Sequence, residues 1–280
     1  MIRAFPRRTK LTPRDELAFV GDPPLFIPQD PGMPVRISVA FTWDIAEAKR
    51  LQRSWSRFYT DVQIGGPALR SPVYGFKPGR FLKTGAVITS RGCIRQCKHC
   101  FVPDREGGLC EIPITTGWNV LDNNLLACSR PHIEAVFDML RKQPHEVHLT
   151  GGLDALLLEP WHVALLQSVR LRSAFFACDY PGAEKPLERV SDLLSDIKRR
   201  QTKRCYVLIG FNGESIIKAE ERLERVFELG FDPFAMLYRD EQTKAWSKEW
   251  KDLQRKWTRP AIYRKKANKR VERTEAAAHP

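Results

Sequence analysis

Three cysteines stand close together in the stretch SRGCIRQCKHCFVP, at positions 93, 97 and 100. Thiolates are the preferred protein ligands of soft metals and of iron–sulfur clusters. A [4Fe-4S] cluster has four irons, so Cys93, Cys97 and Cys100 would hold three of them and leave one open. An open position on a redox-active cluster can bind and reduce a substrate or cofactor. The spacing therefore favours a cluster of this kind.

Two other interpretations of the cysteines remain open at this point. A structural zinc site needs four ligands, and the fourth would have to be His99 or Cys110, neither of which belongs to a second CxxC pair. The grouping can also be a coincidence. A nucleophilic cysteine is a weaker explanation, because it would not need three thiols. For Cys110, Cys128 and Cys178 we expect free buried thiols, with a sulfur or radical role at Cys110 as the alternative.

The composition predicts a cytoplasmic protein. Seven cysteines are an odd number with three of them clustered, which favours a reducing compartment and a metal site over a disulfide framework. No run approaches 18 apolar residues, so we expect no membrane partner. The basic start of the chain lacks the apolar segment of a secretory signal. A chain of 280 residues can form one sizeable core with a small appended domain.

Residues 80–240 alternate between strand and helix patterns. Helical periodicity follows most of the strands, and alternation of this kind predicts a parallel sheet covered by helices. Six strands are fewer than the eight of a complete barrel, so we predict an α/β fold with a partial (βα)6 barrel of the TIM type. Its site should lie at the carboxyl ends of the strands. The expected strands are 85–90, 117–124, 146–152, 173–182, 205–215 and 232–238.

Three further segments flank this region. Residues 1–34 are rich in proline and charge, which predicts an extended arm on the surface. Residues 35–79 contain a strand, a helix that begins after Asp44 as its N-cap, and a second strand, a small βαβ unit. Residues 241–280 form a basic tail, helical or disordered.

The excess positive charge is concentrated near the end of the chain. Residues 239–273 contain 13 Lys and Arg against 5 Asp and Glu, out of a net charge of +13 for the whole chain. Such a tail can bind nucleic acid, or it can be a solvated segment that keeps the protein in solution. Three tryptophans at helical spacing are expected to pack in the core, with base stacking as the alternative: Trp246, Trp250 and Trp257.

The order Cys93-x3-Cys97-x2-Cys100 after a predicted strand resembles the signature of the radical S-adenosylmethionine (radical SAM) superfamily, and the resemblance extends over residues 80–240. The layout is similar to uncharacterised members from prokaryotes and their viruses. His99 replaces the usual aromatic residue before the last cysteine, and its ring could cover the cofactor. Residues 35–79 look like a shortened cobalamin-binding-like domain. No histidine precedes His99, so cobalamin held by a histidine is not expected there.

Two glycine turns extend the resemblance. Thr150, Gly151 and Gly152 resemble the GGEP-like turn that holds the methionine amine of the cofactor, although Leu153 and Asp154 replace its acid and proline. Glycine suits a backbone that must approach a ligand closely. The stretch GFNGES at 210–215 resembles a second turn of the family, which implies a cofactor contact at Asn212.

The resemblance implies a mechanism. A [4Fe-4S] cluster on the three cysteines, reduced by an external flavodoxin- or ferredoxin-like donor, cleaves bound S-adenosylmethionine. The 5′-deoxyadenosyl radical so formed abstracts hydrogen from a substrate, with the protein supplying position and exclusion of solvent. The substrate class stays open between nucleic acid, peptide and metabolite, and the basic tail favours nucleic acid modification. The second hypothesis is a non-catalytic metal- or nucleic-acid-binding protein that uses its cysteines structurally.

Polar residues at predicted strand ends are further candidates for cofactor or substrate contacts. Each has a local alternative: an asparagine turn, a turn before Pro181, or a helix cap. Asp179 could bind a ribose hydroxyl or a substrate amine. The other candidates are Asn123, Asn124, Asp154 and Glu214.

Overall fold

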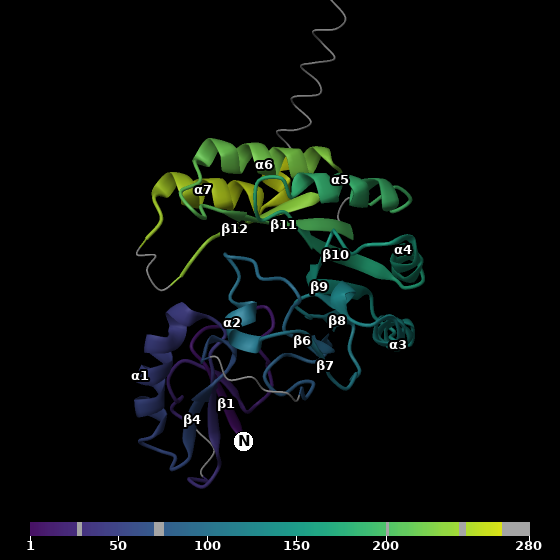
Figure 1. Cartoon of the computed structure of the whole chain (residues 1–280). Helices are drawn as coiled ribbons and strands as arrows, with labels where there is room; N and C mark the ends of the chain where they lie inside the picture. The colour runs from purple at the N-terminus through teal and green to yellow at the C-terminus, as the bar shows by residue number, and fades with distance from the viewer. Residues whose placement is uncertain (27–29, 70–75, 200–201, 241–244, 265–280) are drawn as a thin grey trace, which may run out of the picture. The chain divides into compact units, whose positions relative to one another are not determined.

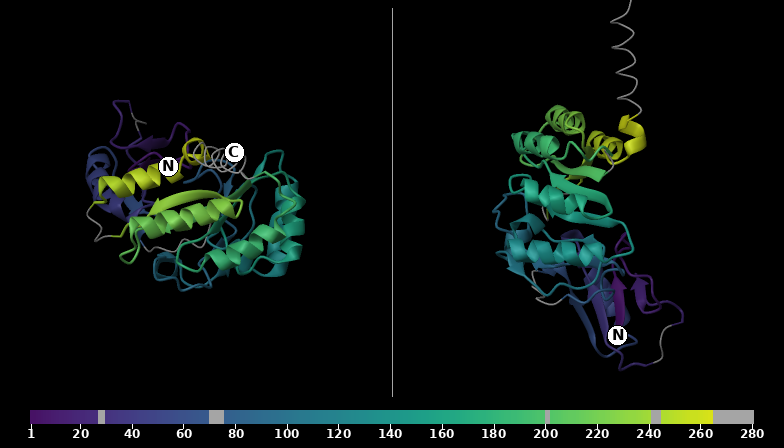
Figure 2. Two further views of the ribbon diagram at one scale, coloured as in Figure 1. Left: turned by 90° about the horizontal axis from the view of Figure 1, so that it is seen from above. Right: turned by 90° about the vertical axis from the view of Figure 1, so that its right-hand side faces the viewer.

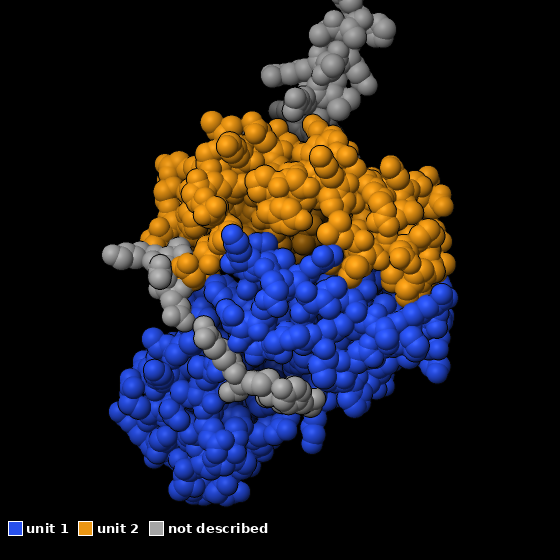
Figure 3. Space-filling view, in the orientation of Figure 1, with its two compact units in different colours: residues 1–151, 168–170 blue, residues 152–167, 171–280 orange. Residues whose placement is uncertain are grey.

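The structure is a computed structural model that describes residues 1–26, 30–69, 76–199, 202–240 and 245–264. The chain divides into two compact units, shown in blue and orange in Figure 3. The first comprises residues 1–151 and 168–170, and the second 152–167 and 171–280. Within the described ranges, no helix has the length and apolar character that a bilayer crossing requires.

A six-stranded parallel sheet defines the α/β class that the sequence predicts (Figure 1). Its order is β12-β11-β10-β9-β8-β5, so each strand pairs with the next one along the chain. The strands are β5 (Ala86–Val87), β8 (Asn119–Val120), β9 (Val147–Leu153), β10 (Leu171–Ala177), β11 (Lys203–Ile209) and β12 (Asp232–Leu237).

A helix lies in each of the last four connections between neighbouring strands, from β8–β9 to β11–β12, as the hydrophobic periodicity predicts. They are α3 (Arg130–Arg141), α4 (Pro160–Gln167), α5 (Glu184–Leu193) and α6 (Ile216–Glu228). Ser129 and Ser215 cap α3 and α6, since each side chain accepts a backbone N–H of the first turn. Gly230, at a φ of 87°, ends α6 in the left-handed conformation that favours glycine.

In the second unit, helices α5, α6 and α7 (Lys248–Trp257) lie side by side against β11 and β12 (Figures 1 and 2). Trp257 is buried and stacks on Tyr263, which confirms core packing for this residue. Trp246 covers Gly210 and donates its indole N–H to the Tyr238 carbonyl at 2.8 Å. Two parts of the predicted tail 241–280 lie outside the described residues, namely 241–244 and 265–280.

The first unit begins with a four-stranded parallel sheet of order β2-β1-β3-β4. The prediction of a surface arm over residues 1–34 is wrong for two segments, because they form β1 and β2 and β1 is entirely buried. These segments form strands because β1 pairs with both β2 and β3. The many prolines between the strands mask this pattern in the sequence. The strands are β1 (Ile2–Phe5), β2 (Ala18–Val20), β3 (Val35–Ser38) and β4 (Val62–Gly65).

Helix α1 (Ile45–Trp55) covers this sheet and connects β3 to β4. Leu51 and Trp55 are fully buried, and the Trp55 indole donates to the Gly21 carbonyl at 3.1 Å. Asp44 stands at the start of α1 as expected, but its side chain makes no cap. The carboxylate instead pairs with the guanidinium of Arg7, with Nε and Oδ2 2.6 Å apart.

The buried position of β1 predicts that the first residues of the chain stabilise the fold. Ile2→Ala is expected to lower the free energy of unfolding by about 2 to 5 kcal/mol, because it opens a cavity at a residue with no exposed surface. Leu25→Ala, at a side chain in the same 1–34 segment that is 90% exposed, should change it by less than about 0.5 kcal/mol. Chemical denaturation of both variants measures the difference, and equal small effects would contradict the assignment of β1.

Candidate functional site

The cysteine loop is closed at its base by a short antiparallel pair, β6 (Ser90–Arg91) with β7 (Cys110–Glu111), and it contains α2 (Val102–Glu106). The chain enters it directly after β5. Gly92 has a φ of 71°, and a Cβ there would lie 2.0 Å from the Gly108 carbonyl oxygen. Only glycine fits this position, so the residue before Cys93 is fixed by the packing of the loop on itself.

The sulfur of Cys93 receives two N–H groups. The backbone N–H of Arg95 lies 3.4 Å from it, and the side-chain amide of Asn124 lies 3.6 Å from it. Donors of this kind tune the potential of an iron–sulfur cluster. Cys97 and Cys100 are joined through a backbone hydrogen bond of 3.0 Å. All three cysteine side chains are partly exposed.

The other cysteines have different surroundings. Burial raises the pKa of Cys128 to about 11 and that of Cys178 to about 12, and it also raises the pKa of Cys205 well above its ordinary value. These thiols stay protonated at neutral pH and are poor metal ligands. Cys110 is exposed in β7, so the prediction of a buried thiol is wrong for this residue, because both residues of this short strand are exposed. The thiols therefore divide into the predicted set of three, one exposed neighbour and three buried groups.

The arrangement also bears on the zinc alternative. Thiolates on one tetrahedral zinc ion lie about 3.8 Å apart. Among the described residues, the one group of three His, Cys, Asp or Glu ligand atoms within 4.8 Å of one another is Asp122, Cys128 and His132, and not the cysteine set. In a [4Fe-4S] cluster each cysteine binds a different iron, so its sulfurs stand farther apart than ligands of a single ion. The loading experiment below decides between a cluster and zinc at Cys93, Cys97 and Cys100.

The Asp122, Cys128 and His132 group is held by hydrogen bonds. The carboxylate of Asp122 accepts the Thr89 N–H at 2.6 Å, the Thr89 hydroxyl at 2.5 Å and the Ser90 hydroxyl at 2.8 Å. Burial raises the pKa of Asp122, and these donors oppose the shift. With its oxygens occupied and the Cys128 thiol protonated, the group serves to fix the strand that enters the cysteine loop.

Several predicted residues gather beside the loop in the first unit. Asn123 donates to Glu106 Oε2 at 2.7 Å, and the Gly92 N–H donates to the same oxygen at 3.1 Å. The Thr150 hydroxyl donates to Asn119 at 2.7 Å. A Cβ at Gly151 would lie 2.1 Å from the Asp122 carbonyl oxygen, so close backbone packing already requires glycine there. His99 is partly exposed.

The remaining predicted residues belong to the second unit, where each has a local structural reason. Asp154 and Asp179 accept the backbone N–H groups of Leu156 and Leu208, at 3.1 and 3.0 Å. Gly152 has a φ of 133°, a conformation that favours glycine. These residues would stand at their positions without any ligand.

The turn after β11 is also explained by its own contacts. Asn212 adopts a φ of 54°, which asparagine tolerates better than most residues. Ser215 caps α6, so a capping role for Glu214 is wrong. The Glu214 carboxylate instead forms a buried ion pair with Arg222 at 2.7 Å and accepts the Gly210 N–H at 3.0 Å.

Sequence reasoning missed two acidic residues of the site. Asp122 precedes the two predicted asparagines, and its place directly after a strand was a signal for it. Glu106 has no such signal, because it meets Gly92 and Asn123 only when the loop folds back.

No model of a known protein family matches the chain, and no curated protein matches it. The radical SAM resemblance therefore rests on the residues described above.

Alkylation distinguishes the cluster from a zinc site. Iodoacetamide should modify Cys93, Cys97, Cys100 and Cys110 in the folded metal-free protein and leave the three buried cysteines intact until denaturant is added. After anaerobic loading with iron and sulfide, peptide mass spectrometry should find the first three protected and Cys110 still modified. Protection of all four after loading with zinc alone would instead support a four-ligand zinc site.

Proposed function

We propose that the chain is a radical SAM enzyme built on a partial (βα)6 barrel, with Cys93, Cys97 and Cys100 holding a [4Fe-4S] cluster. The observation that carries the proposal is the cysteine loop. It follows the first strand of a parallel sheet, exposes three thiols, and gives Cys93 two N–H donors. When bound, the cluster supplies an electron that cleaves S-adenosylmethionine to a 5′-deoxyadenosyl radical, and the radical takes hydrogen from the substrate.

The chain's own residues position this chemistry. Asn124 orients the Cys93 sulfur, and Glu106 holds Gly92 and Asn123 so that the start of the loop keeps its place. His99 would cover the cofactor, and the backbone at 150–152 would receive its methionine amine. Four further residues are candidate contacts of the cofactor or substrate, although their own turns already account for them: Asp154, Asp179, Asn212 and Glu214.

The second hypothesis is a metal- or nucleic-acid-binding protein without catalysis, in which the cysteines serve structure. It predicts that the metal stabilises the fold and that S-adenosylmethionine stays intact.

The proposed enzyme is cytoplasmic and takes electrons from a flavodoxin- or ferredoxin-like partner.

Reductive cleavage of the cofactor tests the enzyme. Protein loaded with iron and sulfide under anaerobic conditions, then given dithionite and S-adenosylmethionine, should form 5′-deoxyadenosine, measured by chromatography with mass detection. Cys97→Ala should abolish the product and lower the iron content, because it removes a predicted ligand. Cys110→Ala is the matched control at an exposed cysteine nearby, and it should retain both. Intact cofactor in the wild type, with unchanged iron in Cys97→Ala, would refute the proposal.

The basic tail gives a separate test of nucleic acid as the substrate class. Truncation after Arg264 is the suitable deletion, because Tyr263 is buried on Trp257 and Arg264 pairs with Asp232. The truncated chain should bind single-stranded RNA or DNA more weakly, with a shallower dependence of affinity on salt, since fewer cations contact phosphates. Fluorescence anisotropy at several salt concentrations measures both. Equal affinity and slope with and without the tail would exclude this role.

A further inference from the structure

A cavity of about 370 Å³ lies in the first unit, outside the residues that the sequence singled out. It opens at the carboxyl ends of β1, β3 and β4, where Phe5, Ala40 and Gly65 line it. Its wall also includes Arg91 and Arg105, which belong to the cysteine loop. The volume falls within the range of small-molecule pockets, about 300 to 1,000 Å³.

Part of the wall is aromatic. The rings come from the end of β1, from the segment between β3 and α1, and from residues 76–81. Trp43, 42% exposed, stacks on the cavity residue Phe41 with ring centroids 4.8 Å apart and nearly parallel planes. Flat apolar walls of this kind suit a planar ligand. The four lining phenylalanines are Phe5, Phe41, Phe76 and Phe81.

The charged part of the wall is mostly cationic. Among the described residues, two carboxylates line the cavity, those of Asp44 and Glu106. Arginine predominates among the cations, and its planar guanidinium is suited to bidentate binding of phosphate. The cationic residues are Arg7, Arg36, Lys77, Arg80, Arg91 and Arg105.

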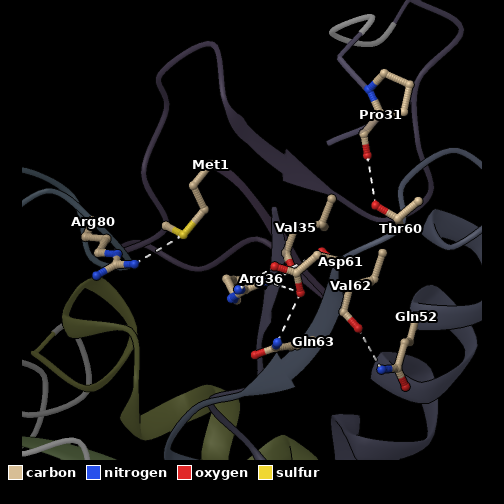
Figure 4. A network of polar contacts seen from close by, with 10 residues as sticks. All are labelled: Met1, Pro31, Val35, Arg36, Gln52, Thr60, Asp61, Val62, Gln63 and Arg80. Atoms are coloured by element: carbon tan, nitrogen blue, oxygen red, sulfur yellow. Dashed lines mark hydrogen bonds and ion pairs between the residues drawn. The ribbon is translucent and has the colours of Figure 1, made fainter. Parts of the chain in front are cut away.

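Two of these cations already have strong partners. Arg7 is paired with Asp44, and Arg36 donates twice to Asp61, at 3.0 and 2.8 Å (Figure 4). Arg80 is different, since it donates to the Met1 sulfur at 3.2 Å, and a thioether is a weak acceptor (Figure 4). The first two arginines shape the wall. The exposed guanidinium of Arg80 lies 5.4 Å from the centroid of the Phe81 ring, and within the described residues it makes no other side-chain hydrogen bond, which leaves donors for a ligand.

The two loop arginines have unmet donors. Within the described part of the chain, the buried Nε atoms of Arg91 and Arg105 have no hydrogen-bond acceptor. Arg91 Nη1 lies 3.7 Å from Glu106 Oε1, which is too far for a hydrogen bond. These Nε atoms are closed off from the cavity, but both residues line it and are partly exposed. Their other N–H groups are therefore the donors that would meet an anionic ligand.

From these observations we infer that the cavity binds a nucleoside monophosphate, with the base against the phenylalanine rings and the phosphate between Arg80, Arg91 and Arg105. A free nucleotide and a nucleotide of a nucleic acid strand share this chemistry. The inference does not depend on the proposed radical reaction, because binding needs neither the cluster nor its cofactor. Its ligand would contact the cysteine loop through Arg91 and Arg105.

Isothermal titration calorimetry of the full chain with AMP, GMP, CMP and UMP tests the inference. At least one nucleotide should bind with release or uptake of heat, while its nucleoside and inorganic phosphate should each bind at least about tenfold more weakly. A tetranucleotide that binds more tightly than the free nucleotide identifies a strand as the source. Equal or weaker binding identifies the free nucleotide.

Three variants locate the ligand. Arg105→Gln should weaken binding about ten- to a hundredfold, because it removes charge-assisted hydrogen bonds. Gly65→Leu tests the cavity by its shape, since a Cβ there meets no atom within 4 Å and the φ is not in the left-handed region. Arg53→Gln, exposed on α1 and absent from the cavity wall, is the matched control. Thermal unfolding of each variant is the control for correct folding.

The outcomes are distinct. Loss of binding in Arg105→Gln and Gly65→Leu with normal binding in Arg53→Gln supports the site. Absence of binding by all four nucleotides, unchanged binding in both cavity variants, or equal binding of inorganic phosphate overturns the inference. The same titrations in a Cys93→Ala, Cys97→Ala, Cys100→Ala variant should be unaffected, so failure of the proposed enzyme and failure of this site are separate results.

Discussion

The buried carboxylate of Asp122 accepts three hydrogen bonds from Thr89 and Ser90, and the whole candidate site depends on this contact. Asp122 comes two residues after β8, and its donors come just before the cysteine loop. A buried carboxylate is tolerated only when its hydrogen bonds are satisfied, so the contact fixes the distance between the two strand ends. The backbone of Asp122 also packs on Gly151. One residue thereby places three segments relative to one another.

Glu106 has a similar function on the other side of the loop. Its carboxylate accepts the Gly92 N–H and the Asn123 amide, and it faces Arg91 and the cavity. The thiol loop and the basic cavity are therefore built from a common set of side chains. A ligand in the cavity that contacts Arg91 would compete for or strengthen the contacts of Glu106.

The glycines and polar residues that resemble family motifs have structural duties as well. Gly151 is required by the adjacent backbone, and Glu214 by the buried Arg222. A ligand contact is compatible with these duties, but it is not needed to explain the residue types. Cys93, Cys97 and Cys100 differ in this respect. They are partly exposed, and the Cys93 sulfur accepts N–H groups from Arg95 and Asn124, so the proposal rests mainly on them.

The sequence by itself determined the alternation of strands and helices, because hydrophobic periodicity, caps and glycine stops are local properties. It also determined the cysteine spacing, and with it the proposed chemistry. Only the tertiary structure decided that Ile2–Phe5 is a buried strand and that Asp44 pairs with Arg7. It alone brought Asp122, Glu106 and the cavity arginines together. These contacts join residues far apart in the chain, and strand pairing and the partner of a buried charge depend on neighbours that no local pattern contains.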